Sequence, residues 1–156
     1  MPKFEIVAVK ETPYLYVDRT TSMDGDEIGQ AMHTGFAQVW AFMEHHGVAP
    51  AGGGLSVYHD YAQDKVDFRV GFVVARDDMA AAEGAVKADV TPAGRVLHFT
   101  LTGSYAGLRP AYEAMMTYME AEGLRSVRPT WEVYMNGPNE VPEDRLVTEC
   151  YQAFAA

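Results

Sequence analysis

The residue best suited to chemistry in this sequence is an acid set where a strand is expected. Glu132 lies in the segment 131–136, whose aromatic and β-branched residues indicate a strand. Because side chains alternate along a strand, Glu132 shares one face with Tyr134 and Asn136, and residues 131, 133 and 135 take the other face. A carboxylate ringed by aromatic side chains suits a large organic cation, since ring faces attract positive charge and the carboxylate neutralises it.

Other uses of Glu132 remain open at this stage. Burial would raise the pKa of its carboxyl, which suits acid–base catalysis, with Tyr58 or Tyr134 assisting by donating a hydrogen bond. The simpler alternative is a surface acid, or one paired with an arginine such as Arg95, Arg109 or Arg128. Both alternatives can be tested by the burial and the partners of the carboxylate.

Several large side chains are candidates to line a ligand site around Glu132. They are aromatic rings, one methionine and one histidine that the expected helices and strands carry toward a common groove, although such rings also serve as ordinary core. The candidate ligand-binding residues are Glu132, Tyr58, Tyr134, Trp40, Tyr112, Phe36, Met116, Tyr16 and His98.

Other motifs point to no cofactor and no metal. His45 and His46 have no carboxylate or cysteine at ligand spacing, and His59 lies well downstream. The glycines 52–54 are not followed by Gly-Lys-Ser or Gly-Lys-Thr, so they predict a flexible loop rather than a phosphate cradle. Cys150 alternates within a strand and has no neighbouring base in sequence, which indicates a buried, inert thiol.

The charge and composition of the chain limit the classes of molecule that it is expected to bind. The 156 residues carry 22 acidic and 12 basic side chains, a formal net charge of -10, which opposes direct nucleic-acid binding and favours cationic ligands. No apolar run reaches the roughly 20 residues that cross a bilayer, and the start of the chain does not resemble a secretory signal. We therefore expect a cytoplasmic protein without membrane contact.

The sequence repeats itself at an offset of 76 residues. Residues 43–47 recur as 119–123. With the same offset, residues 55–58 align with 131–134, and Phe36 aligns with Tyr112. Each copy predicts the order strand, strand, helix, strand, strand. The expected strands are 4–9, 14–20, 55–60 and 66–75 in the first copy, and 85–90, 96–102, 131–136 and 146–154 in the second. The first helix is expected to start at Asp26 as cap and stop at Gly47, and the second to start at Ser104 as cap and stop at Gly123.

This pattern predicts an α+β fold. Two duplicated strand–helix–strand–strand units, each extended by a further strand, would form an antiparallel sheet with two helices and a central groove at a pseudo-two-fold axis. We expect one domain, 1–156, made of repeats at about 1–78 and 79–156. Clefts between repeats are common ligand sites, so the groove is the expected position of Glu132.

Motifs of the second repeat resemble a known family. The sequence Thr102-Gly103-Ser104-Tyr105 precedes Leu108 and Tyr112, and Gly123 is followed by Pro129-Thr130-Trp131-Glu132-Val133-Tyr134 and then Leu146-Val147-Thr148-Glu149. These segments are similar to the bacterial gyrase-inhibitory-protein-like (GyrI-like) family, also described as the effector-binding domain of multidrug-responsive transcription activators. The resemblance implies a tandem repeat with a central groove in which Glu132 neutralises lipophilic cations among aromatic rings.

Members of that family differ in function, and fold alone does not choose between them. Some are fused to DNA-binding domains, some oppose DNA gyrase or toxins, and some hydrolyse cyclopropane-bearing DNA-alkylating compounds. Because the first strand begins almost at once, we expect a stand-alone protein that binds bulky, aromatic, cationic compounds at Glu132. The alternative is a hydrolase of hydrophobic electrophiles that uses Glu132, and a further alternative is a protein partner of DNA gyrase.

Overall fold

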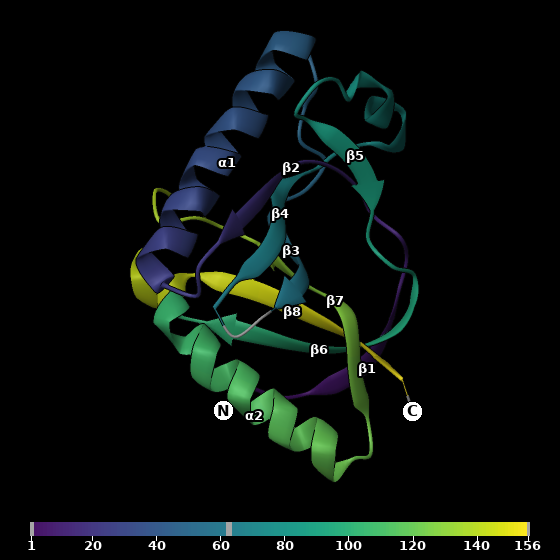
Figure 1. Cartoon of the computed structure of the whole chain (residues 1–156), viewed down its shortest axis with the longest axis vertical. Helices are drawn as coiled ribbons and strands as arrows, with labels where there is room; N and C mark the ends of the chain where they lie inside the picture. The colour runs from purple at the N-terminus through teal and green to yellow at the C-terminus, as the bar shows by residue number, and fades with distance from the viewer. Residues whose placement is uncertain (1, 62–63, 156) are drawn as a thin grey trace.

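The computed structural model describes residues 2–61 and 64–155 (Figure 1). Within those ranges the chain forms one sheet of eight strands, two long helices and three short 3-10 turns. The strands are β1 (Glu5–Val9), β2 (Pro13–Thr21), β3 (Gly54–Tyr61), β4 (Val66–Val73), β5 (Lys87–Val90), β6 (Gly94–Thr102), β7 (Arg125–Tyr134) and β8 (Val147–Ala155). The helices are α1 (Gly25–His46) and α2 (Leu108–Ala121), and the 3-10 turns are η1 (Arg76–Ala81), η2 (Tyr105–Gly107) and η3 (Glu143–Arg145).

The sheet has the symmetry that the sequence repeat predicts. Its strand order is β1-β6-β8-β7-β3-β4-β2-β5, and exchanging each strand with its counterpart in the other repeat gives the same order read backwards. The central strands β3 and β7 are antiparallel, and Ser56 lies directly opposite Glu132, its own counterpart at an offset of 76. The pseudo-two-fold axis therefore passes between these two residues, and the predicted fold class is confirmed. The predicted limit of the repeats near residue 78 falls within η1.

The helix starts differ from the predicted caps. Asp24, not Asp26, caps α1, because its Oδ2 accepts a hydrogen bond from the Glu27 amide at 3.1 Å. Asp26 instead lies in the first turn, where an acid is favoured by the helix dipole. Ser104 caps the turn η2, and α2 begins only at Leu108. Gly47 ends α1 in the left-handed conformation at φ 69°, as predicted.

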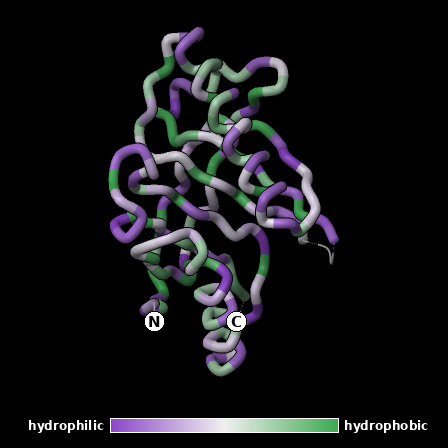
Figure 2. Tube along the Cα trace, turned by 90° about the vertical axis from the view of Figure 1, so that its left-hand side faces the viewer, coloured by the Kyte–Doolittle hydropathy of each residue, from purple (hydrophilic) through white to green (hydrophobic). Residues whose placement is uncertain are grey.

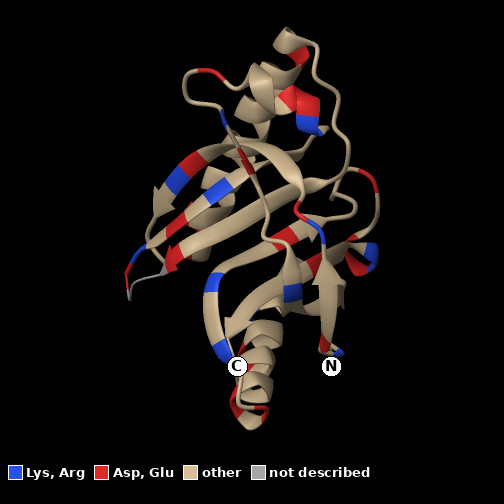
Figure 3. Ribbon diagram, turned by 90° about the vertical axis from the view of Figure 1, so that its right-hand side faces the viewer, with Lys and Arg blue, Asp and Glu red and all other residues tan. Residues whose placement is uncertain are grey.

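Each helix covers its own half of one sheet face. Val39 and Met43 of α1 pack on Leu15 and Val17 of β2. In the other half, a second core joins α2 to β6 and β8; its buried members are Leu97, Phe99, Ala111, Met115, Met119 and Cys150. Hydrophilic residues recur in the peripheral loops (Figure 2), and residues of both charges are interspersed along the ribbon (Figure 3).

The opposite face of the sheet is closed by its own curvature. Tyr14 and Tyr16 of β2 and Val96 of β6 form one buried cluster with Leu55 and Trp131 of the central strands. Strands far apart in the sheet order thus meet behind β3 and β7. No helix in the described ranges has the length and apolar character needed to cross a membrane.

Candidate ligand-binding site

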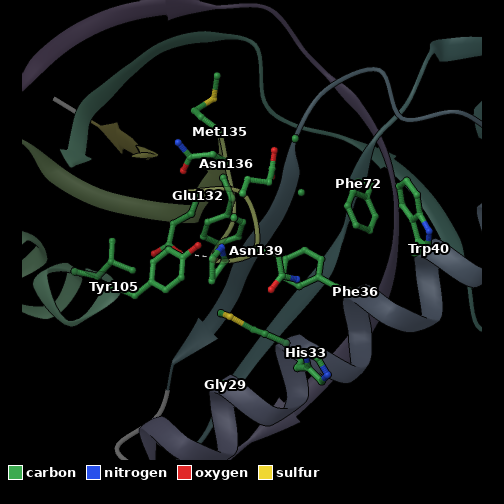
Figure 4. A pocket seen from close by; sticks show the side chains of 18 of the residues that line it. Gly29, His33, Phe36, Trp40, Phe72, Tyr105, Glu132, Met135, Asn136 and Asn139 are labelled. Atoms are coloured by element: carbon green, nitrogen blue, oxygen red, sulfur yellow. Dashed lines mark hydrogen bonds between the residues drawn. The ribbon is translucent and has the colours of Figure 1, made fainter. Parts of the chain in front are cut away.

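A large cavity lies between α1 and the central strands. It has a volume of about 1060 Å³ and is lined from α1, from the ends of β3, β4 and β7, and from residues 135–140 that follow β7 (Figure 4). Side chains from both repeats face it, among them Phe36 and Trp40 of the first and Tyr105 and Glu132 of the second. The cavity therefore occupies the junction at which the sequence predicts a groove.

Glu132 is buried at the base of this cavity. Its side chain is on β7, and the residue is 2% exposed. The hydroxyl of Tyr112, from α2, donates a hydrogen bond to Oε2 at 2.6 Å, and the hydroxyl of Tyr134 donates one to Oε1 at 2.6 Å. Ser56, across the pseudo-two-fold axis, lies 2.9 Å from the Tyr134 hydroxyl. Both carboxylate oxygens are thus held by neutral donors.

No basic side chain of the described residues forms an ion pair with this carboxylate. Among the ion pairs formed by residues 2–61 and 64–155, none includes Glu132, and Arg128 binds Asp60 at 2.8 Å instead. A surface acid or an arginine pair is therefore excluded as the explanation of Glu132. Burial raises the pKa of its carboxyl, although the two tyrosine hydrogen bonds act in the opposite direction. Burial and the Glu132 charge also raise the pKa values of Tyr112 and Tyr134.

Aromatic rings continue from Glu132 toward the open side of the cavity. The Tyr134 and Phe36 ring centroids are 5.9 Å apart, those of Phe36 and Phe72 are 5.5 Å apart, and those of Phe72 and Trp40 are 5.5 Å apart. On the other side of Tyr134, the Tyr105 ring makes an edge contact at 5.9 Å. Trp40 is 43% exposed, so the row ends in an accessible indole. These rings offer both apolar area and negative ring faces to a ligand.

A second cavity continues on the α2 side of Glu132. Its volume is about 470 Å³, and it shares Tyr58, Leu108 and Glu132 with the first. Tyr112 and Met116 of α2 line it. Glu132 therefore stands where the two cavities meet.

Seven of the predicted ligand-binding residues line these two cavities. The first cavity includes Phe36, Trp40 and Tyr134, the second includes Tyr112 and Met116, and both include Tyr58 and Glu132. Their role in binding stays a prediction, which the proposal below takes up.

Tyr16 and His98 lie on the opposite face of the sheet, outside both cavities. The Arg69 guanidinium carbon lies 4.2 Å from the centre of the Tyr16 ring, and His98 Nε2 lies 3.3 Å from a Glu149 carboxylate oxygen. The reason is strand alternation: the neighbours of each residue in sequence, Leu15 on β2 and Leu97 on β6, face the helices. The prediction that Tyr16 and His98 face the groove is therefore corrected: both face the opposite side of the sheet.

Further lining residues were not anticipated, among them Met32, Phe72, Tyr105 and Met135. The alternation predicts Met135 on the face opposite Glu132, but β7 ends at Tyr134, and Met135 turns to line the cavity with 60% exposure. Apart from being aromatic, Phe72 and Tyr105 had no feature in the sequence that indicated a place at the cavity. Their positions depend on how β4 and η2 approach α1 and β7.

The motifs set aside in the sequence have structural roles. Among the described residues, no three His, Cys, Asp or Glu side chains are grouped to hold a metal ion. Cys150 is buried beside Glu132, and burial raises the pKa of its thiol. The glycines 52–54 are not simply a flexible loop: a Cβ on Gly53 would lie 2.4 Å from the Tyr134 carbonyl oxygen, so a close backbone contact requires glycine there.

The raised pKa of Glu132 predicts a pH-dependent stability. The folded chain keeps the Glu132 proton at pH values where the unfolded chain has released it. The stabilising contribution is therefore complete below the ordinary glutamate pKa and is lost as the pH rises through the raised value. Thermal unfolding over a pH series should show wild type losing stability relative to E132Q across that window. Parallel curves for the two proteins would contradict the prediction.

Comparison with known proteins identifies the same architecture elsewhere. The model of the GyrI-like small molecule binding domain matches residues 2–153. No functionally curated protein matches the chain. The C-terminal domain of EcmrR is 20% identical, with a TM-score of 0.82 over 99% of this chain and 98% of that one. A hydrolase from Listeria innocua is 17% identical, with a TM-score of 0.64 over 98% and 92%. SAV2435 bound to tetraphenylphosphonium is 13% identical, with a TM-score of 0.65 over 99% and 94%.

Proposed function

The chain belongs to the family of GyrI-like small molecule binding domains, and from that premise we propose that it binds bulky aromatic cations at Glu132. The observation that carries the proposal is a 2% exposed carboxylate that no basic side chain of the described residues pairs with, at the base of a cavity lined by aromatic rings. A buried, uncompensated carboxylate costs free energy of folding. A cationic ligand would supply the missing charge.

The shape and chemistry of the first cavity support an aromatic ligand. Its volume of about 1060 Å³ exceeds that of a single small amine, and Phe36, Phe72 and Trp40 present rings along it. A delocalised cation loses less hydration on entry than a compact ammonium and gains stacking with the rings. That SAV2435, which has the same fold, holds tetraphenylphosphonium is consistent with such a ligand.

A matched pair of ligands tests the proposal on the wild-type protein. N-methylacridinium is a permanent cation, and acridine has the same ring system but is neutral at mildly alkaline pH. We expect the cation to bind at least about tenfold more tightly, because only the cation gains the attraction of the Glu132 carboxylate. Titration followed by ligand fluorescence gives both dissociation constants. Equal affinities would show that charge is not what the cavity recognises.

A hydrolase acting on hydrophobic electrophiles is the second candidate. Its specific support is the raised pKa of the Glu132 carboxyl, which makes the carboxylate a stronger base, beside the Tyr134 hydroxyl at 2.6 Å. In that reaction Glu132 would accept a proton from water while the water oxygen bonds to an electrophilic cyclopropane carbon. The ring C–C bond at that carbon breaks, and its electron pair leaves with the other carbon, which takes up a proton. Mass spectrometry of a cyclopropane-bearing electrophile incubated with the protein decides between the two: a ring-opened product formed by wild type and absent with E132Q makes it an enzyme.

A further inference from the structure

The second cavity differs in chemistry from the first. Its floor is formed by Thr130 of β7 and Gln152 of β8, which are 6% and 2% exposed and lie on the same face of the sheet as Glu132. In the first cavity the counterpart of Thr130 at the offset of 76 is Gly54, which has no side chain to form such a floor. The two chambers related by the pseudo-two-fold axis therefore differ in the buried polar pair that only the second contains among its lining residues.

The hydrogen bonds on this floor use up its donors. Thr130 Oγ1 donates its single proton to Gln152 Oε1 at 2.6 Å. Gln152 Nε2 donates to the carbonyl oxygens of Val127 and Ala153, each at 2.8 Å. A threonine hydroxyl has two lone pairs and an amide oxygen has two, so acceptor capacity remains on both groups after their protons are committed. What the floor offers to the cavity is therefore hydrogen-bond acceptors.

The charged groups of this cavity fit the same pattern. Glu132 borders it, and Glu113 of α2 lines it as a second carboxylate. Arg109 also lines it, one helical turn before Glu113, and both residues are exposed at the rim, where their opposite charges offset each other. Below that rim, the donors of Thr130 and Gln152 are already committed, so Thr130, Gln152 and Glu132 have only acceptor capacity left for a ligand.

We infer that this second cavity is a subsite for a polar arm of the ligand that donates hydrogen bonds. The inference rests on the proposed function and specifies its ligand class: an elongated molecule with its aromatic part toward Phe36 and Trp40, its positive charge at Glu132, and a hydroxyl, amide N–H or primary ammonium group over Thr130 and Gln152. A group without N–H or O–H would cover the Thr130 hydroxyl oxygen and the second lone pair of Gln152 Oε1 without offering them a donor, which is unfavourable.

Two ligands with the same aromatic cation and tails of equal length test the subsite. N-(hydroxypropyl)acridinium ends in a donor, and N-butylacridinium ends in a methyl group. The preference of a protein for the first over the second is the ratio of their dissociation constants. Replacing Thr130 by Val keeps the shape but removes the acceptor, and we expect it to reduce this preference about fivefold, the effect of one hydrogen bond. T130S, which restores a hydroxyl, should restore the preference.

The chain offers a matched control for the threonine. Thr148 is a fully buried threonine on the same face of β8 that lines neither cavity, so T148V should leave the preference unchanged. If T130V fails to fold, S126W fills the same cavity from its exposed rim and should abolish the preference. An unchanged preference in T130V or in folded S126W overturns the subsite. Failure of the cation site would be seen separately: each of the two acridinium ligands would then bind E132Q as tightly as it binds wild type.

Discussion

Replacement of Glu132 by Gln is expected to weaken the binding of N-methylacridinium about 100-fold. The amide has nearly the shape of the carboxylate and can still accept from one tyrosine and donate to the other, so the two hydroxyl contacts at 2.6 Å need not be lost. What disappears is the negative charge at a 2% exposed position, where water screens it poorly. A loss of about 100-fold corresponds to about 2.7 kcal/mol of binding free energy.

The measurement needs a control for the overall charge of the protein. With a net charge of -10, any glutamate substitution weakens the attraction of cations slightly. Glu149 is a strand glutamate of similar type on the opposite face of the sheet, 3.3 Å from His98. Calorimetric titration should find E149Q close to wild type and E132Q greatly weakened, while acridine binds all three proteins alike. Equal losses in both variants would assign the effect to net charge and remove Glu132 from the site.

The position of Glu132 was predictable because two independent periodicities agree on it. Strand alternation places Glu132 beside Tyr134, and the offset of 76 residues makes Ser56 its counterpart, which the observed register sets directly opposite it. An antiparallel pair between equivalent strands of two repeats must have residues facing their own counterparts at the symmetry axis. The sequence therefore predicted the fold and the place of Glu132 at the junction of the two repeats, and the role of Glu132 in binding stays a prediction.

The periphery of the site was less predictable, because tertiary placement decides it. Tyr16 and His98 have the residue types of a pocket, but alternation within β2 and β6 turns them to the other sheet face. Tyr105 reaches the pocket only because η2 precedes α2 and brings its ring to Tyr134. Sequence periodicity predicts which residues share a face of one strand, and not which face a helix will cover.

Replacement of Gly71 by Ala is expected to lower the free energy of unfolding by about 3 kcal/mol or more. Gly71 lies in β4 between Tyr16 of β2 and Leu55 of β3. A Cβ at this position would lie 1.7 Å from the Leu15 carbonyl oxygen, which is part of the backbone and has no rotamer by which to move away. Relief therefore requires β2 to shift as a whole, and such overpacking in a buried region is costly.

A second glycine provides the control for the substitution itself. Gly29 lies within α1, and a Cβ there would meet nothing within 4 Å. Alanine favours a helix more than glycine, so G29A should raise the free energy of unfolding by about 0.5–1 kcal/mol, opposite in sign to G71A. Urea unfolding of the three proteins measures both changes. A G71A protein as stable as wild type would show that β2 does not approach β4 this closely.

The same close approach links the stability of the sheet to the proposed binding site. Because β2 runs close to Gly71, its residues Tyr14 and Tyr16 pack against Leu55 and Trp131. This cluster lies on the face of the central strands that points away from Glu132. Leu55 and Trp131 are the sequence neighbours of Ser56 and Glu132, so this cluster supports from behind the two residues at the pseudo-two-fold axis. A shift of β2 in G71A should therefore weaken cation binding as well as folding, whereas G71A with full affinity for N-methylacridinium would show that the back cluster does not position Glu132.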